Sequence, residues 1–212
     1  MGAVAWACRA PQGNGEAQMK RAFSATDVRS ALLDSARLKR ALAVREAARI
    51  ARMGALLVAA LRRGGRLYTC GNGGSAADAQ HVAAELVGTY ADRRRRALPA
   101  LALTTDTSAL TAIGNDLGFD QVFARQVEAL VRKGDVLLCL STSGRSPNVL
   151  KAAQAARRLG VKILALTGAP GEPLAGMADL AVRVPSRSTA RIQECHIAID
   201  HILCEAVERA FI

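Results

Sequence analysis

The sequence predicts an α/β protein in which a mostly parallel sheet of about five strands is flanked by helices and preceded by long N-terminal helices. Short apolar runs alternate with helical stretches, and each run is apolar along its whole length, as in strands that are covered on both faces. The chain has 212 residues, half of them hydrophobic. That length supplies one core, so we expect a single domain.

The N-terminal part divides into two segments. Residues 1–25 contain Gly, Pro, Gln and Asn without a hydrophobic period, which predicts a flexible extension ahead of one domain over 26–212, with Met19 as an alternative start. From Asp27 to Arg63 apolar residues recur at helical spacing, which predicts two helices or one long bent helix. A long amphipathic helix outside a sheet is typical of an oligomer contact.

The rest of the chain supplies the sheet and its covering helices. Helical stretches are expected to begin near Ser75, Thr107, Ser146 and Gly171, and one amphipathic helix over 188–211 closes the chain. The predicted strands are the apolar runs at residues 66–70, 97–103, 135–140, 161–168 and 179–185.

Composition excludes several classes of protein. The net charge of +11 invites an anionic ligand, but only 3% of residues are aromatic, so stacking on nucleic acid is disfavoured. The block Arg93–Arg96 is interpreted as a solvated surface loop. The sequence has no apolar run long enough to cross a membrane, and its first residues lack the order of a secretory leader. Both observations favour a cytoplasmic location. The five cysteines lack a C-x-x-C pair and are interpreted as reduced core thiols.

Two turns between strand and helix contain the groups that could bind a ligand. Gly71-Asn72-Gly73-Gly74-Ser75 follows the first strand, with Ser75 placed to cap the next helix, and Ser141–Pro147 follows the third, with Ser146 as N-cap. Hydroxyls, free N–H groups and a helix dipole suit phosphate. Because neither turn matches a dinucleotide or P-loop fingerprint, a sugar phosphate is the better ligand.

A second set of candidates lies on two helices. His81 and Glu85 are four residues apart on the helix after the glycine turn, so both can reach one metal ion or substrate. The last helix adds Gln193, His196 and His201. Spacing alone pairs Gln193 with His196, one turn away, more readily than with His201, about 12 Å along the axis.

Four motifs together resemble the SIS (sugar isomerase) fold, which is flavodoxin-like, and within it the phosphoheptose isomerase family. They are GNGGSAADAQHVAAEL, TTDTSALTAIGNDLGF, GDVLLCLSTSGRSPNVLKA and RIQECHIAIDHILCE, in the family's order and spacing. The resemblance extends from about Ser24 to Phe211. It implies a homotetrameric, cytoplasmic isomerase that converts D-sedoheptulose 7-phosphate to D-glycero-D-manno-heptose 7-phosphate, the first step of ADP-heptose synthesis for lipopolysaccharide core.

The resemblance also assigns roles to residues. It implies one Zn²⁺ per subunit, bound by His81, Glu85, Gln193 and His201, so the family favours His201 where spacing favours His196, which becomes structural. Glu85 and His201 are the implied catalytic acid/base pair. The implied substrate-binding residues are Asn72, Gly73, Gly74, Ser75, Glu85, Asn115, Asp116, Ser141, Thr142, Ser143, Ser146 and Gln193.

Two departures and two rival functions qualify this assignment. Thr89 stands where the family commonly has Arg, and Arg145 replaces a usual Asn or Lys, so the finer substrate contacts are open. A relative that binds the bacterial replication initiator shares the fold, and the basic charge suits it, but such proteins lack the residues equivalent to Glu85 and His201. A sugar-phosphate-sensing regulator would need a helix-turn-helix domain that this length does not accommodate.

Overall fold

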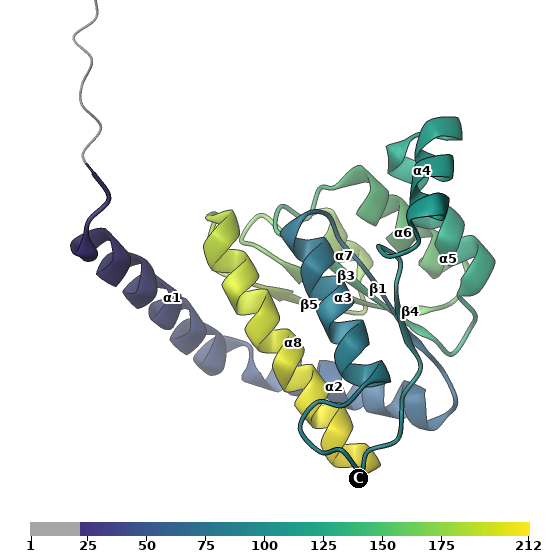
Figure 1. Cartoon of the computed structure of the whole chain (residues 1–212), viewed down its shortest axis with the longest axis horizontal. Coiled ribbons are helices and arrows are strands. Elements are labelled where there is room, and N and C mark those ends of the chain that lie inside the picture. The colour runs from purple at the N-terminus through teal and green to yellow at the C-terminus, as the bar shows by residue number, and fades with distance from the viewer. Residues whose placement is uncertain (1–21) are drawn as a thin grey trace, which may run out of the picture.

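A computed structural model describes residues 22–212 and contains one five-stranded sheet, with all strands parallel, in the order β2-β1-β3-β4-β5 (Figure 1). This order is that of the flavodoxin-like doubly wound folds, in which the chain adds strands first on one side of β1 and then, from β3 onward, on the other. The strands are β1 Leu67–Cys70, β2 Ala100–Ala102, β3 Val136–Ser141, β4 Lys162–Thr167 and β5 Leu180–Arg183. The predicted fold class and all five strand positions are confirmed.

Helices cover both faces of the sheet. Alternate strand residues point to opposite faces, so Leu138 and Leu164 pack against α2, α3 and α8, whereas Leu137 and Ile163 pack against α5, α6 and α7. The helices are α1 Ala25–Arg45, α2 Ala47–Arg62, α3 Gly74–Val87, α4 Thr107–Asp116, α5 Ala124–Leu130, α6 Pro147–Arg158, α7 Leu174–Met177 and α8 Thr189–Phe211, with a 3₁₀ turn η1 at Phe119–Gln121.

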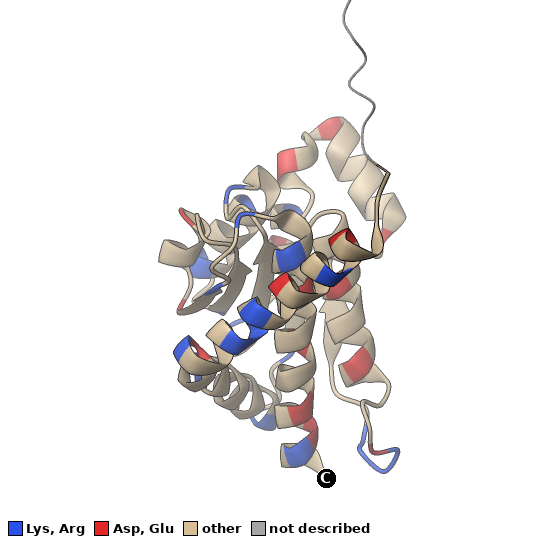
Figure 2. Cartoon of the chain, turned by 90° about the vertical axis from the view of Figure 1, so that its left-hand side faces the viewer, with Lys and Arg blue, Asp and Glu red and all other residues tan. Residues whose placement is uncertain are grey.

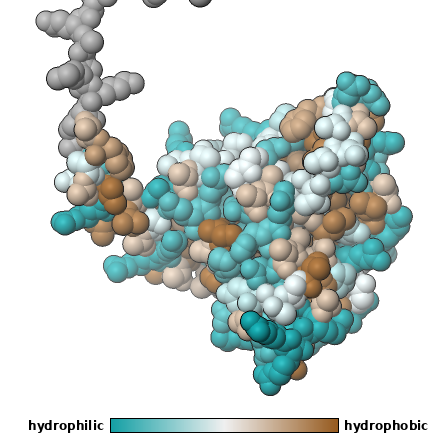
Figure 3. All heavy atoms as spheres, in the orientation of Figure 1, coloured by the Kyte–Doolittle hydropathy of each residue, from teal (hydrophilic) through white to brown (hydrophobic). Residues whose placement is uncertain are grey.

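The predicted N-terminal helical segment is two helices, separated at Glu46. Ser24 and Asp27 form a capping box that starts α1. Figure 1 shows α1 projecting from the body, and Figure 3 shows hydrophobic side chains along it. Leu32 and Leu33 on this helix are more than half exposed, which leaves an apolar surface with nothing from residues 22–212 over it.

One expectation about the surface is wrong at one residue. The interpretation of Arg93–Arg96 as a solvated surface loop holds for the other three arginines, which are exposed, but the Arg95 side chain is buried and makes hydrogen bonds to backbone carbonyls. The expected flexible extension over 1–25 lies, except for residues 22–25, outside the described residues. Within 22–212, no helix is both long and apolar enough to cross a membrane.

Candidate functional site

The glycine turn after β1 has a backbone conformation that depends on glycine. Gly73 has φ 55° and is the N-cap of α3, a conformation that side chains with a Cβ rarely adopt. Gly74 lies against α8: a Cβ there would come within 2.4 Å of Gln193 Nε2. The turn therefore lies at the carboxyl end of β1, with Gly74 packed against the Gln193 amide.

The predicted capping role of Ser75 is wrong. Since α3 already begins at Gly74, Ser75 is inside its first turn, where it is buried. Gly73 precedes the helix, and no side chain among residues 22–212 caps it. With Gly73 as N-cap, the helix starts two residues earlier than it would with Ser75 as N-cap.

The hydroxyl-rich turn after β3 follows the prediction more closely. Ser146 is the N-cap of α6 and Pro147 its first residue. The Ser146 hydroxyl lies 3.1 Å from the Ser141 hydroxyl, and Ser141 Oγ accepts a hydrogen bond from Gly144 N. Thr142 is half-buried and Ser143 is exposed, so the turn presents hydroxyls at the start of a helix whose dipole favours an anion.

A pair of amides joins the two turns. Asn72 Nδ2 donates to Asn148 Oδ1 at 2.9 Å, and Asn148 Nδ2 donates to Asn72 Oδ1 at 2.8 Å. Asn148 is buried in the first turn of α6. The order of strands in the sheet reverses between β1 and β3. The Asn72–Asn148 pair therefore spans the switch point, where doubly wound folds bind ligands. Asn148 was not among the predicted site residues, and its only signal in the sequence is its place two residues after a predicted N-cap.

Three potential metal ligands meet between α3 and α8. His81 Nε2 lies 2.8 Å from His201 Nε2 and 3.4 Å from Glu85 Oε1. All three side chains are partly buried, and their ligand atoms lie within 4.8 Å of one another. Two imidazole nitrogens and a carboxylate oxygen are donors that Zn²⁺ accepts, and their convergence on one point fits a bound cation.

The remaining predicted site residues fall in different places. Gln193 is on α8, two helical turns from His201, and its side chain contacts Gly74. Asn115 and Asp116 lie exposed at the end of α4, where Asn115 Nδ2 donates a hydrogen bond to Asp116 Oδ1 at 2.7 Å. Figure 1 places α4 across the molecule from α8. The structure therefore brings His81, Glu85 and His201 together and does not join Asn115 or Asp116 to them within this chain.

His196 lies in the interior and not in the cluster. It is fully buried, and its Nε2–H donates to the Thr167 carbonyl at 3.2 Å. Burial lowers the pKa of His196 to about 4, although the bond to Thr167 acts in the opposite direction. Burial also raises the pKa of Asp200, and the nearby Asp78 raises it further. His196 and Asp200 are both buried on the inner side of α8.

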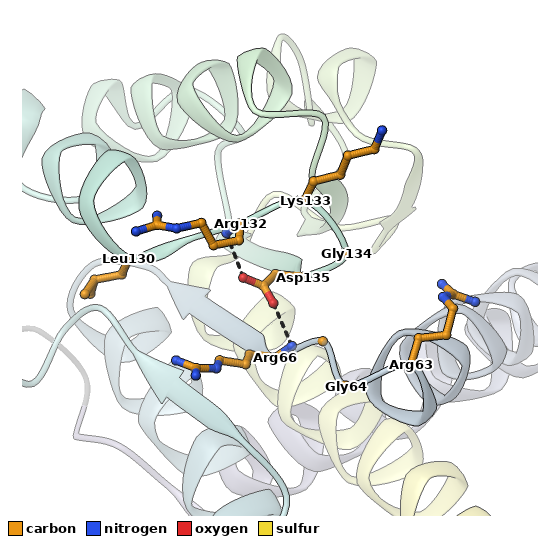
Figure 4. A pocket seen from close by; sticks show the side chains of 9 residues that line it. Arg63, Gly64, Arg66, Leu130, Arg132, Lys133, Gly134 and Asp135 are labelled. Atoms are coloured by element: carbon orange, nitrogen blue, oxygen red, sulfur yellow. Dashed lines mark hydrogen bonds between the residues drawn. The ribbon is translucent and has the colours of Figure 1, made fainter.

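A basic hollow occupies the opposite, amino-terminal end of the strands (Figure 4). It measures about 440 Å³. Its carboxylate, Asp135, is buried and accepts hydrogen bonds from Arg66 N and Arg132 N. Asp135 therefore joins two loops, and the hollow lies apart from the two turns at the carboxyl ends of β1 and β3.

Comparison with known proteins agrees with this geometry. Residues 33–168 match the SIS domain family, so the chain belongs to the SIS domain proteins, the class that the fold and the two loops define. Within that class it belongs to the phosphoheptose isomerase family. The phosphoheptose isomerase of Chlorobaculum parvum is 59% identical over 179 residues, which cover 84% of this chain and 86% of that protein.

Solved structures give the same assignment. The phosphoheptose isomerase of Neisseria gonorrhoeae superposes with a TM-score of 0.82 at 45% identity, covering 87% of this chain and 98% of that one. The enzyme from Francisella tularensis gives a TM-score of 0.84 at 39% identity, covering 88% and 100%. The family predicted from the four motifs is confirmed.

Proposed function

We propose that the chain interconverts D-sedoheptulose 7-phosphate and D-glycero-D-manno-heptose 7-phosphate, the first step of ADP-heptose synthesis for lipopolysaccharide core. The observation that carries the proposal is the convergence of His81 and Glu85, on the helix that follows the glycine turn, with His201 of α8, in a chain 59% identical to a phosphoheptose isomerase. The replication-initiator-binding alternative is not favoured, because the relatives at this identity are named as isomerases.

The reaction moves a proton between neighbouring carbons through an enediolate. In our proposal the carboxylate of Glu85 removes a proton from C1 of the ketose and returns it to C2. His201 donates a proton to the C2 oxygen as the enediolate forms and takes the proton of the C1 hydroxyl as the aldehyde forms. No proton is gained or lost overall, so the two groups regain their starting states after each turnover.

The loops would position the sugar. The phosphate would be bound by the start of α6 and by the hydroxyls of Ser141, Thr142, Ser143 and Ser146. Arg145 in this loop stands where the family usually has Asn or Lys. The glycine turn, with Asn72 and the amide of Gln193, would hold the carbon chain so that C1 and C2 reach Glu85. Asn115 and Asp116 would reach the sugar only if substrate or a second subunit brings α4 closer.

A Zn²⁺ ion is part of the proposal. His81, Glu85 and His201 would bind it, with Gln193 as the fourth ligand that the family implies, and the donor types fit. Bound there, the ion would supply a positive charge that polarises the sugar oxygens. We further propose that the enzyme is a cytoplasmic homotetramer assembled through the N-terminal helices.

Turnover of sedoheptulose 7-phosphate by the purified protein tests the function. We expect the aldose phosphate to appear, followed by NMR or by a coupled assay. A folded, zinc-loaded protein without turnover would overturn the proposal and favour the initiator-binding alternative.

A further inference from the structure

Arg95 differs from every neighbour in its basic run. The Arg95 side chain is 1% exposed, whereas that of Arg94 is 81% exposed. Figure 2 shows the run as a blue bend after α3, close to the C-terminal end of α8. Burying a guanidinium is costly unless it is fully hydrogen-bonded, so the partners of Arg95 indicate its role.

Apart from the carbonyl of Arg96, at 2.7 Å from Arg95 Nη1, the carbonyls that Arg95 binds are those at the end of α3. Arg95 Nη2 donates to Glu85 O at 2.6 Å and to Gly88 O at 2.9 Å. Arg95 Nη1 donates to Leu86 O at 2.9 Å. The last carbonyls of a helix have no intrahelical partner, and a cation there also interacts favourably with the helix dipole. Arg95 is therefore a buried C-terminal cap on the helix that contains His81 and Glu85.

Glu208 on α8 anchors this cap. Its carboxylate lies 3.5 Å from Arg95 Nε and accepts hydrogen bonds from Tyr90 N at 3.2 Å and Ala91 N at 3.1 Å. Burial raises the pKa of Glu208, but the backbone hydrogen bonds and Arg95 outweigh it and leave the pKa below its usual range. The carboxylate is thus held ionised opposite the guanidinium, and it joins the end of α3 to α8.

Arg95 and Glu208 hold backbone groups next to two of the three proposed metal ligands, Glu85 and His201. Glu85 is in the last turn of α3, where helices fray most easily, and Arg95 bonds to the carbonyl of Glu85 itself. The ring of Tyr90, whose backbone N–H is bound by Glu208, lies 6.1 Å from the His201 ring. The Arg95–Glu208 pair thus constrains the backbone of Glu85 directly and holds the Tyr90 ring next to the ring of His201.

We propose that Arg95 and Glu208 are positioning residues that fix Glu85 and His201 for metal binding and for the isomerisation. The inference rests on the proposed function of the cluster. Loss of Arg95 would free the last turn of α3, so the Glu85 carboxylate would sample several positions and the metal site would lose affinity. A residue needed only for folding would lower stability and leave the folded site unchanged.

Cobalt titration of the metal-stripped protein tests this proposal, because the visible spectrum of bound Co²⁺ reports the geometry of its ligands. The variants are Arg95→Met and the milder Arg95→Lys, with Arg94→Met as the matched control on the exposed neighbour. We expect Arg95→Met to weaken Co²⁺ binding by about 10-fold or more, the effect typical of residues that orient ligands, and to change the spectrum. Arg95→Lys should fall in between, and Arg94→Met should match wild type.

Steady-state kinetics on the zinc-loaded variants give a second readout. Arg95 lies between the end of α3 and the start of β2, at the amino-terminal end of the parallel strands, whereas the proposed phosphate loop follows the carboxyl end of β3. Therefore kcat should fall while KM stays near the wild-type value. Unchanged Co²⁺ affinity, spectrum and kcat in folded Arg95→Met would overturn the proposal and leave Arg95 a purely structural residue. If Arg95→Met does not fold, Arg95→Lys and Glu208→Gln, measured well below their melting temperatures, decide in the same way.

The test separates this inference from the proposed function. A wild-type chain that binds Co²⁺ but does not isomerise the heptulose phosphate leaves the positioning claim to be decided by the spectra alone. A wild-type chain that binds no Co²⁺ overturns the metal site and this inference together.

Discussion

Asn72 and Asn148 bind each other through two hydrogen bonds, at 2.9 and 2.8 Å, although 76 residues separate them along the chain. Asn148 Oδ1 also accepts from Val149 N, so its orientation is fixed within α6. The glycine turn and the hydroxyl turn are therefore one unit, and the distance between them is set by an amide pair that bridges the two strands.

Asn148→Ala should loosen this unit. It leaves the Asn72 amide without its partner, so we expect the free energy of unfolding to fall by about 1–3 kcal/mol and KM for the sugar phosphate to rise. Thermal unfolding and steady-state kinetics measure the two effects. Gln154→Ala, at an exposed position of the same helix, is the control and should change neither. An unchanged KM in Asn148→Ala would mean that the two loops do not act as a unit.

Glu85→Gln tests the catalytic carboxylate. The substitution keeps the size of the side chain and removes most of its basicity, so turnover should fall by about 10²–10⁴-fold, as for loss of a general base. Ser143→Ala is the comparison: it removes one neutral hydrogen bond among several, so its smaller effect should fall on KM. Turnover by Glu85→Gln close to that of wild type would exclude Glu85 as the base.

Metal content tests the choice between the two histidines of α8. Protein purified without chelator should contain about one zinc per chain, because the cluster offers a ligand set suited to it. His201→Ala should lose most of the metal, whereas His196→Ala, which removes a buried side chain outside the cluster, should retain it in the folded fraction. Elemental analysis decides, and the reverse pattern would favour the local helical spacing over the family assignment.

Stability should depend on pH through His196. Burial lowers its pKa to about 4 in the folded protein, below the value of about 6.5 for an unfolded histidine. Between these values the unfolded chain binds more protons, so stability rises with pH, by at most about 1.4 kcal/mol per pH unit. Denaturant titrations of wild type and His196→Gln between pH 4 and 7 measure this contribution. The variant should lose this part of the slope, and equal slopes would show that His196 does not titrate in this range.

Assembly should depend on the exposed apolar surface of α1. Leu33→Glu places a charge on this surface, so we expect the proposed tetramer to dissociate at micromolar concentration, as measured by light scattering. Leu159→Glu, at a partly exposed position after α6, is the control and should remain a tetramer. A wild-type monomer at this concentration would contradict the proposed assembly.

The sequence was informative wherever a feature depends on neighbouring residues. The five strands followed from apolar runs, because parallel strands are buried on both faces. Ser146 and Pro147 have the predicted places at the start of α6, although the Ser146 side chain makes no capping hydrogen bond, because the preference for these residues at a helix start is local. His81 and Glu85 were predicted to share one helix face, and their side chains lie 3.4 Å apart.

Features that depend on distant contacts were missed. The burial of Arg95 requires both the end of α3 and Glu208, which lies 113 residues further along the chain, so its composition suggested a surface loop. Asn148 needed knowledge of which strands are neighbours. The cap at Ser75 was wrong because Gly73, at positive φ, is the N-cap of α3, and the next residue, Gly74, packs against Gln193 of α8.

The proposed phosphate loop is made largely of neutral groups: four hydroxyls, backbone N–H groups and the start of α6. The nearby cation, Arg145, donates through Nε to the carbonyl of Glu172 and is exposed. Dissolved ions screen exposed charges beyond about 8 Å at physiological ionic strength, but they weaken short hydrogen bonds in a partly buried turn far less. The affinity of this protein for its sugar phosphate should therefore depend only weakly on salt, even though the chain has a net charge of +11.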